Sequence, residues 1–205
     1  MLYPEEIKIL ESFRLSPNSW LTIKEIMKRS EKRSYNWAYL AIQRLCKERV
    51  LKSEKVGNTW RYTININSQK AIFALTLAEQ SMAETRFPNR LTQDLIQKLT
   101  QHTQFFCLVI GGSYASGTQR RDSDIDLVLI VPDDSSKKEI KPYLVYAEEL
   151  EGYEFHNQIF TKDEFRQMLK DKGENFGKEL VRKHIVLYGV DTYYAMLREA
   201  MPYDI

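Results

Sequence analysis

Cysteine is scarce in this sequence, and no apolar run is long enough to cross a membrane. The two cysteines, Cys46 and Cys107, each lie inside an apolar pattern. We therefore expect reduced thiols in a protein core, rather than a disulfide or a metal site. The first ten residues, MLYPEEIKIL, also lack the basic and then apolar pattern of a signal peptide. Together these absences predict a cytoplasmic protein that makes no membrane contact.

Acidic and basic residues are nearly equal in number, but they are unevenly distributed. The chain of 205 residues carries 30 Lys and Arg against 28 Asp and Glu. Residues 1–66 hold 13 of the basic residues and 7 of the acidic ones, a net charge of +6, whereas the remainder has a net charge of −4. A basic N-terminal third suggests that this region, if either, binds nucleic acid. The length and the aromatic content of 12% favour one large or two small folded domains over disorder.

Residues 1–66 have the pattern of three helices followed by a β-hairpin. Thr22-x-x-Glu25 is a capping box, and Ser34 is an N-cap candidate. The expected helices are Pro4–Leu15, Ile23–Ser30 and Tyr35–Arg49, and the expected strands are Val50–Lys55 and Thr59–Ile64, joined across Val56-Gly57-Asn58. In the third helix, the residues expected to face the core are Trp37, Leu40, Ala41 and Leu45. This order of elements resembles a winged helix-turn-helix domain.

A winged helix-turn-helix domain inserts its third helix into the major groove of double-stranded DNA, and its hairpin is the wing. The resemblance therefore implies two sets of DNA-contacting residues. The groove-facing candidates are Arg33, Ser34, Tyr35, Asn36, Tyr39 and Gln43. The phosphate-binding candidates on the wing are Lys52, Lys55, Asn58 and Arg61. Winged helices also bind other proteins, and a basic face is often simply solvated, so these alternatives stay open.

Residues 67–90 are expected to form a helical connector. Ser68 is placed to cap a helix that runs to about Glu84, and Pro88-Asn89 should break it. The helix is apolar enough to pack on a domain, and it could equally be the dimerisation element of a homodimer. A further helix, Leu91–Gln101, leads directly into the next strand and is therefore assigned to the second domain.

The most informative stretch is FFCLVIGGSYASGTQRRDSDIDLVLIVP, residues 105–132. It predicts a buried strand, Phe105–Ile110, then a glycine-rich turn, and then a second strand, Ile125–Val131, with Asp124 and Asp126 at its start. Alternation along a strand puts both carboxylates on one face, about 6–7 Å apart, where they can share a hard cation such as Mg²⁺. Glycine lets backbone N–H groups approach an anion closely. Together these features predict a nucleoside triphosphate site.

Gly112-Ser113 and, eleven residues on, Ser123-Asp124-Ile125-Asp126-Leu127 resemble the signature of the polymerase-β-like nucleotidyltransferases, closest to their minimal branch. The resemblance covers about residues 91–189. It implies a small mixed sheet with flanking helices, an NTP substrate, which we expect to be ATP, and Mg²⁺ or Mn²⁺ as the cofactor. It also implies that Asp124 and Asp126 are catalytic metal ligands. The nucleotide-binding candidates are Gly111, Gly112, Ser113, Ser123, Arg120 and Arg121.

The sequence departs from that family at the third carboxylate, which is usually an Asp on the strand after the next helix. That strand is expected at Tyr153–Phe160, which contains no Asp. Glu154, His156 and Gln158 would face the aspartates' side if the strands are neighbours, and Asn157 would do so if the register slipped. Glu154 is a hard anionic ligand, whereas His156 suits Zn²⁺ better than Mg²⁺ and could instead take the acceptor's proton. Both are therefore catalytic candidates, against the alternative that polar residues merely solvate the strand.

The remaining elements complete a chain of fold class α+β. A helix is expected to start near Lys141, so that Pro142 lies in its first turn, and to end at Glu151-Gly152. Later elements are expected as a helix from a cap at Thr161 to Lys170, a helix Phe176–Lys183, a strand Ile185–Tyr188 and a last helix Thr192–Ala200 that could pack on either domain. The segments are the winged helix-turn-helix domain (1–66), the connector (67–90), the nucleotidyltransferase domain (91–189) and a C-terminal tail (190–205).

Two functions follow from these patterns. In the first, the chain moves an NMP from an NTP to a hydroxyl of a partner protein, as adenylylating antitoxin-type members of the family do, or of an RNA, while the winged helix binds DNA. In the second, the departure at the third carboxylate marks a weakened site, and the chain is a DNA-binding transcriptional regulator whose second domain binds a nucleotide. Antibiotic modification, which shares the motif, is a third and less favoured class.

Overall fold

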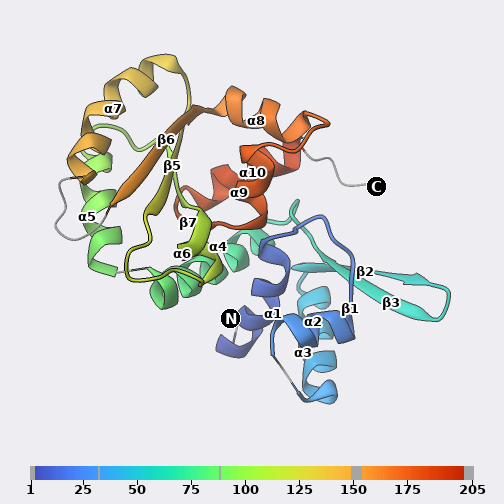
Figure 1. The fold of residues 1–205 in the computed structure, drawn as a ribbon. Helices are drawn as coiled ribbons and strands as arrows, with labels where there is room; N and C mark the ends of the chain where they lie inside the picture. Colours follow the sequence, from blue (N-terminus) through green and yellow to red (C-terminus); the bar gives the residue numbers. More distant parts are fainter. Residues whose placement is uncertain (1–2, 32, 88, 149–153, 201–205) are drawn as a thin grey trace. The chain divides into compact units, whose positions relative to one another are not determined.

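The computed structural model describes residues 3–31, 33–87, 89–148 and 154–200 (Figure 1). These residues form two compact units that divide between Ser81 and Met82, within helix α4 (Gln69–Arg86). The division thus falls inside the segment that the sequence marks as a connector. Pro88 and residues 151–153, where a helix was expected to end and a strand to begin, lie outside the described residues. Within the described ranges, every helix is too short or too polar to cross a bilayer.

The first unit contains three helices, a three-stranded sheet and most of α4. Its elements are α1 (Pro4–Arg14), β1 (Leu21–Thr22), α2 (Ile23–Arg29), α3 (Tyr35–Lys47), β2 (Leu51–Val56) and β3 (Thr59–Ile64). The strands are antiparallel in the order β1-β3-β2. The three expected helices and the hairpin are therefore present, each with bounds within two residues of the expected ones, and β1 adds a third strand.

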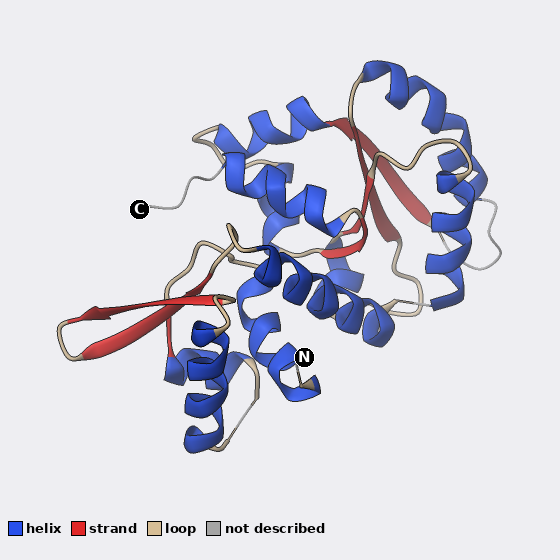
Figure 2. Ribbon diagram, turned by 180° about the vertical axis from the view of Figure 1, so that it is seen from behind, coloured by secondary structure: helices blue, strands red, loops and turns tan. Residues whose placement is uncertain are grey.

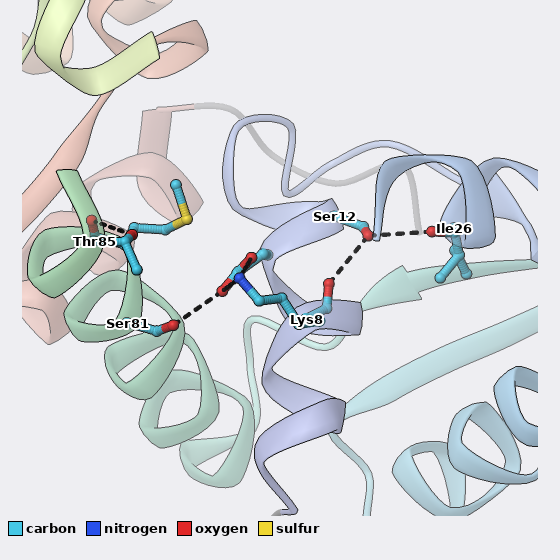
Figure 3. A network of polar contacts seen from close by, with 7 residues as sticks. Lys8, Ser12, Ile26, Ser81 and Thr85 are labelled. Atoms are coloured by element: carbon cyan, nitrogen blue, oxygen red, sulfur yellow. Dashed lines mark hydrogen bonds and ion pairs between the residues drawn. The ribbon is translucent and has the colours of Figure 1, made fainter. Parts of the chain in front are cut away.

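Polar contacts tie α1 to α2 and α4 in this unit. Ser12 Oγ lies 3.5 Å from the carbonyl oxygens of Lys8 and Ile26 (Figure 3). The side chains of Arg14 on α1 and Glu79 on α4 are almost fully buried, and Arg14 Nη1 lies 3.7 Å from Glu79 Oε2. This ion pair lies in the core, so it couples α1 to α4 electrostatically.

The buried face of α3 differs from the expected one. Leu40, expected in the core, is 59% exposed, whereas Ala38, Ala41, Ile42 and Leu45 are buried. These four residues follow the spacing i, i+3, i+4, i+7 of a single helix face. The expectation for Leu40 was wrong because the small alanines define the buried face, and at 100° per residue Leu40 lies on the far side of the helix.

The second unit is a four-stranded mixed sheet with helices on both faces. Its elements are α5 (Asn89–Thr100), β4 (Cys107–Ile110), α6 (Gly112–Ser116), β5 (Ile125–Val131), α7 (Asp134–Glu148), β6 (Phe155–Thr161), α8 (Lys162–Lys170), α9 (Phe176–Arg182), β7 (Ile185–Tyr188) and α10 (Val190–Ala200). The strand order is β6-β5-β4-β7, with β5 and β6 parallel and the other pairs antiparallel. Figures 1 and 2 show α5 and α7 on one side of this sheet and α8, α9 and α10 on the other.

Central strand β5 determines where the polar residues of the sheet lie. Ile125, Leu127 and Leu129 are fully buried in the core that α5 and α7 share with the sheet. Because side chains alternate along a strand, Asp126 and Val128 lie on the opposite face, the side of α8, α9 and α10. The apolar run that follows the aspartates therefore anchors the strand and fixes the direction of Asp126.

Helix α7 begins at Asp134, seven residues before the start expected near Lys141. Asp133 Oδ1 accepts a hydrogen bond from Ser136 N (2.9 Å) and one from Ser136 Oγ (3.0 Å), and these bonds lower the pKa of Asp133. Pro142 lies inside the helix, where it lacks the N–H that would bond the preceding turn. The expected start was wrong because the cap at Asp133 outweighs the loss of that one bond.

Helix α10 belongs to the second unit, which settles where the expected last helix packs. It lies against α8, β4 and β7, and Tyr193, Tyr194 and Leu197 are buried there. Its first residue is Val190 rather than Thr192, because the helix begins directly after Gly189, which has a positive φ of +73°. Residues 201–205 of the expected tail lie outside the described residues.

Both cysteines are free thiols, as their apolar surroundings predict. Cys46 is partly buried and Cys107 is fully buried in β4. Burial disfavours the thiolate, and it raises the pKa of Cys107 to about 12 and that of Cys46 above its ordinary value. Neither thiol is therefore activated as a nucleophile.

Candidate functional site

The turn after β4 brings two glycines against Asp126. Gly111 N–H donates a hydrogen bond to the backbone oxygen of Asp126 (2.8 Å). Gly112 has a positive φ of +57°, and a Cβ added there would lie 1.8 Å from Asp126 Oδ2. Both the backbone conformation and the lack of space therefore require glycine at position 112. The glycine turn and the β5 carboxylate are in direct contact, as a site made of both would need.

Helix α9 supports this turn from the other side. A Cβ added at Gly111 would lie 3.2 Å from Leu180 Cδ1, and Leu180 is 2% exposed. Leu180 thus limits the space behind the turn and was missed as a site residue in the sequence. Its only sequence signal is the apolar spacing of residues 176–182, which indicates burial but names no partner.

The two aspartates differ in exposure. Asp126 lies within β5 with its side chain 33% exposed, whereas Asp124 precedes the strand and is exposed. Ile125 between them is fully buried, and its N–H donates to the backbone oxygen of Glu154 (2.8 Å). Alternation therefore places Asp124 and Asp126 on one face. The hydrogen bond from Ile125 N–H to Glu154 O places Glu154 beside Asp124 on the neighbouring segment.

Strand β6 lies directly beside β5, and His156 and Gln158 face the side of the aspartates. The parallel register pairs Asp126 with His156 and Val128 with Gln158. His156 Nδ1 lies 3.6 Å from Asp126 Oδ1, and the His156 side chain is 68% exposed. Asn157 lies on the other face, where its Nδ2 donates to Leu144 O of α7 (3.3 Å). The register slip that would have turned Asn157 toward the aspartates does not occur.

The aspartate pair fits a hard divalent cation that takes its remaining ligands from elsewhere. Carboxylate oxygens are the ligands that Mg²⁺ and Mn²⁺ prefer, and both side chains are accessible. Among residues 3–31, 33–87, 89–148 and 154–200, no group of three or more His, Cys, Asp or Glu side chains is placed to hold a metal ion. Mg²⁺ commonly completes its coordination with water and with the phosphates of a substrate, so two protein carboxylates are compatible with it.

The loop between the turn and β5 closes on itself. Arg120 N donates to Ser123 Oγ (2.8 Å), and Ser123 N donates to Arg120 O (3.1 Å). This reciprocal pair gives Ser123 a structural role in the loop. The side chains of Arg120 and Arg121 are exposed, and Ser113, in the first turn of α6, is half-buried. The structure thus brings Gly112 and Asp126 together and leaves both arginines accessible to a bound phosphate.

In the first unit, the expected groove-facing residues share an exposed surface of α3 and the residues before it. Ser34 Oγ accepts from Trp37 N (3.4 Å) and so caps the helix. The rings of Tyr35 and Tyr39 are nearly parallel, with centroids 6.5 Å apart. The other exposed members of the set are Arg33, Asn36 and Gln43. Helix α3 itself contains no Asp or Glu, so none of its own side chains would repel phosphate.

The wing residues divide between two faces of the hairpin. Lys55 pairs with Trp60, and the neighbouring rung pairs Glu54 with Arg61. Directly opposed residues share a face and successive rungs alternate, so Lys55 and Trp60 lie on one face and Arg61 on the other. Arg61 Nη2 contacts Glu54 Oε1 at 2.5 Å, so the guanidinium already has an acidic partner on the hairpin. Trp60, which is 51% exposed, was missed in the sequence because it looks like an ordinary strand residue.

The face that carries Lys55 and Trp60 also carries Tyr62, two residues along β3 from Trp60. Tyr62 is almost fully buried, and its hydroxyl hydrogen-bonds to Gln43 of α3. Burial raises the pKa of Tyr62 above its ordinary value. Tyr62 therefore connects the face of the wing that carries Lys55 to the face of α3 that carries Gln43. Asn58, in the tip of the hairpin, and Lys52 are exposed.

The comparison with known proteins bears on the second unit. Residues 96–187 match the family model described as a nucleotidyltransferase domain. No curated protein and no solved structure matches the chain. The matched range includes the glycine turn, both aspartates and His156, and it ends before α10. The match therefore supports a nucleotidyltransferase domain in the second unit, and residues 1–95 lie outside it.

Proposed function

We propose that this chain transfers an NMP from an NTP, with ATP as the expected nucleotide, to a hydroxyl group of a macromolecule. The observation that carries the proposal is the contact between Gly112 and Asp126, since it sets a glycine turn directly against a carboxylate. The match of residues 96–187 to a nucleotidyltransferase domain supports it. NMP transfer needs those two features side by side, because the triphosphate and the cation that neutralises it bind as one ligand.

The residues of the turn and of β5 would bind the nucleotide. Backbone N–H groups around Gly112 and Ser113 would hold the phosphates, and Arg120 and Arg121 would add charge from the exposed loop. Asp124 and Asp126 would hold Mg²⁺ or Mn²⁺. When bound, the cation neutralises charge on the triphosphate and on the departing pyrophosphate.

His156 would serve as the base for the acceptor. Its side chain is exposed beside Asp126, so an acceptor hydroxyl can reach it without displacing a core residue. The hydroxyl gives its proton to the imidazole, its oxygen bonds to the α-phosphorus, and the bond from that phosphorus to the pyrophosphate oxygen breaks. Glu154, exposed directly before β6, is the second candidate, as an additional hard ligand for the cation.

The exposure of His156 and Asp124 favours a large acceptor, a partner protein or an RNA. Incubation of lysate from the source organism with α-³²P-NTPs and Mg²⁺ or Mn²⁺ tests this, because it leaves the acceptor open. We expect a labelled protein or RNA band with the wild type and none with Asp124→Ala/Asp126→Ala. If the wild type and the double variant give the same labelling while the wild type still binds nucleotide, the proposed catalytic activity would be contradicted.

The first unit would bind double-stranded DNA through α3 and the Lys55 face of the wing. This rests on the exposed Tyr35, Asn36, Tyr39 and Gln43, on the lack of acidic residues in α3, and on the resemblance to winged helix-turn-helix domains. At low salt, Lys55→Ala should weaken binding to duplex DNA, whereas Arg61→Ala should change it less, since Glu54 already occupies Arg61. Equal and unchanged affinities for both variants and the wild type would contradict the assignment.

The second candidate function is that of a DNA-binding transcriptional regulator with a nucleotide-binding second domain. The observation that favours it is that the described residues offer two carboxylates at the site and no group of three metal-ligating side chains. It predicts nucleotide binding that depends on Asp126, without label transfer. The lysate experiment therefore separates the two candidates.

A further inference from the structure

Helix α6, which carries Gly112 and Ser113, is too short to be stable by itself. It has five residues, fewer than the number at which helix propagation repays the cost of nucleation. Its position against Asp126 is also closely defined, because even one methyl group at Gly112 would overlap the carboxylate. Contacts from outside α6 must therefore hold it in place.

The hydrogen bonds to the carbonyl oxygens of this turn identify one such contact. Four of the five carbonyls from Gly111 to Ala115 accept from donors in the same turn or just after it. These bonds are Ala115 N to Gly111 O (3.2 Å), Ser116 Oγ to Gly112 O (3.0 Å), Thr118 N to Ser113 O (3.0 Å) and Gly117 N to Tyr114 O (3.3 Å). The fifth, Ala115 O, accepts from Nη1 of Arg86 (2.5 Å), the last residue of α4.

Arg86 also lies against the residue that ends α6. Gly117 has a positive φ of +71°, and a Cβ added there would lie 3.2 Å from Arg86 Cζ. A guanidinium at the C-terminal end of a helix both bonds a carbonyl and complements the negative end of the helix dipole. The neighbouring Phe87 packs edge-on against Tyr114 of α6, with ring centroids 6.1 Å apart. Arg86 and Phe87 thus hold α6 from the end opposite to Gly112.

We propose that Arg86 is a positioning residue for the nucleotide site, a role that rests on the proposed function. The hydrogen bond from Arg86 to Ala115 O holds the C-terminal end of α6 in place. The position of α6 in turn determines the distance of Gly112 and Ser113 from the Asp126 carboxylate. Arg86 itself does not touch the nucleotide. Its loss lets α6 shift, which lowers the affinity for the triphosphate more than it lowers the rate of the chemical step.

Arg90 provides a matched control four residues away. Its side chain is 96% exposed, and its Nε lies 3.9 Å from Asp94 Oδ2, a long contact. We would compare Arg86→Ala, Arg86→Lys and Arg90→Ala with the wild type by the Kd for ATP with Mg²⁺, by KM and kcat for label transfer, and by the melting temperature. We expect Arg86→Ala to raise Kd and KM about tenfold, with kcat changed about twofold or less, because one charge-assisted bond is lost. Arg86→Lys should recover part of the affinity, and Arg90→Ala should match the wild type.

The outcomes separate this inference from the proposed function. If the wild type binds no nucleotide, the proposed function fails and the positioning role fails with it. If the wild type binds and Arg86→Ala binds equally well, only the positioning role is overturned. A third outcome is that Arg86→Lys loses as much affinity for ATP as Arg86→Ala and that both variants melt at equally lowered temperatures. That outcome would show that Arg86 serves folding alone.

Discussion

Gly57 and Gly112 have nearly the same backbone angle but different surroundings. Gly57, at the tip of the hairpin in the first unit, has φ +59°, and a Cβ there would meet nothing within 4 Å. Gly112 has φ +57°, and a Cβ there would lie 1.8 Å from Asp126 Oδ2. The first glycine is required by conformation alone, whereas the second is required by conformation and by contact with a carboxylate. A positive φ therefore marks a turn, and the space around it indicates whether the turn also forms part of a site.

The largest expected effect on nucleotide affinity among single substitutions is that of Gly112→Ala. The new methyl group must displace the Asp126 carboxylate or the turn, so the phosphate donors and the metal ligand separate. We expect the affinity for ATP with Mg²⁺ to fall by more than about tenfold, since charge-assisted contacts are lost. Isothermal titration calorimetry measures this directly. Wild-type affinity in a folded Gly112→Ala variant would show that the contact with Asp126 is not part of a nucleotide site.

His156→Ala tests whether the side chain beside Asp126 takes part in the chemistry. We expect kcat for label transfer to fall about 100-fold or more, the usual contribution of a general base, with the Kd for ATP unchanged. Gln158→Ala is the matched control, because Gln158 lies on the same face of β6, two residues further along. A similar loss in both variants would point to disruption of the strand rather than to a base.

Gly57→Ala tests whether the hairpin glycine is required by its backbone conformation alone. We expect a loss of about 1–2 kcal/mol in the free energy of unfolding, the cost of a left-handed backbone for a residue with a Cβ. Nucleotide affinity should remain that of the wild type, because no side chain near Gly57 belongs to the site. Chemical denaturation and ATP titration of the same preparation measure both quantities. A drop in ATP affinity here would contradict the assignment of the site to the second unit.

Glu164→Gln is expected to have the smallest effect, a small loss in the free energy of unfolding. Glu164 lies in the second unit but outside the candidate site. Lys137 and the Thr161 N–H hold the pKa of Glu164 below its ordinary value of 4.5. A carboxyl with a lowered pKa stabilises the fold above its unfolded pKa, and this contribution is lost as the pH falls through the folded value. The variant should lose at most about 0.5 kcal/mol at pH 7, since the pair is half-exposed.

The pH series then checks the sign of that effect. The difference in unfolding free energy between the wild type and Glu164→Gln should shrink as the pH falls below 4.5. A difference that is constant from pH 7 to pH 3 would contradict the role of the charged carboxylate. ATP affinity at pH 7 should be unchanged, which separates a loss of stability from the loss of site geometry in Gly112→Ala.

The sequence predicts those parts of the structure that depend on neighbours in the chain. The capping boxes at Thr22 and Thr161 are present, because such a box is complete within four residues. The glycine turn and the two aspartates lie together because one short loop joins their strands. Periodicity failed for Leu40, since alanines carry little weight in an apolar pattern although they are readily buried.

Contacts between distant segments could not be predicted in the same way. Alternation along the strand gave the correct face for His156, but only on the condition that β5 and β6 are neighbours. Arg86 lies 29 residues before its partner Ala115, in a helix that the sequence presents as a connector. Arg61 looks like a phosphate ligand until the register of the hairpin sets it opposite Glu54. Each of these depends on strand pairing or helix packing rather than on local spacing.

The most direct test of the account is the binding of ATP, with and without Mg²⁺, to the wild type and to Asp124→Ala/Asp126→Ala. We expect Mg²⁺ to strengthen binding to the wild type, and we expect the double variant to lose this dependence, with a Kd raised at least about tenfold. Equal affinities for the two proteins, both insensitive to Mg²⁺, would contradict the claim that the glycine turn and the aspartates form one nucleotide site.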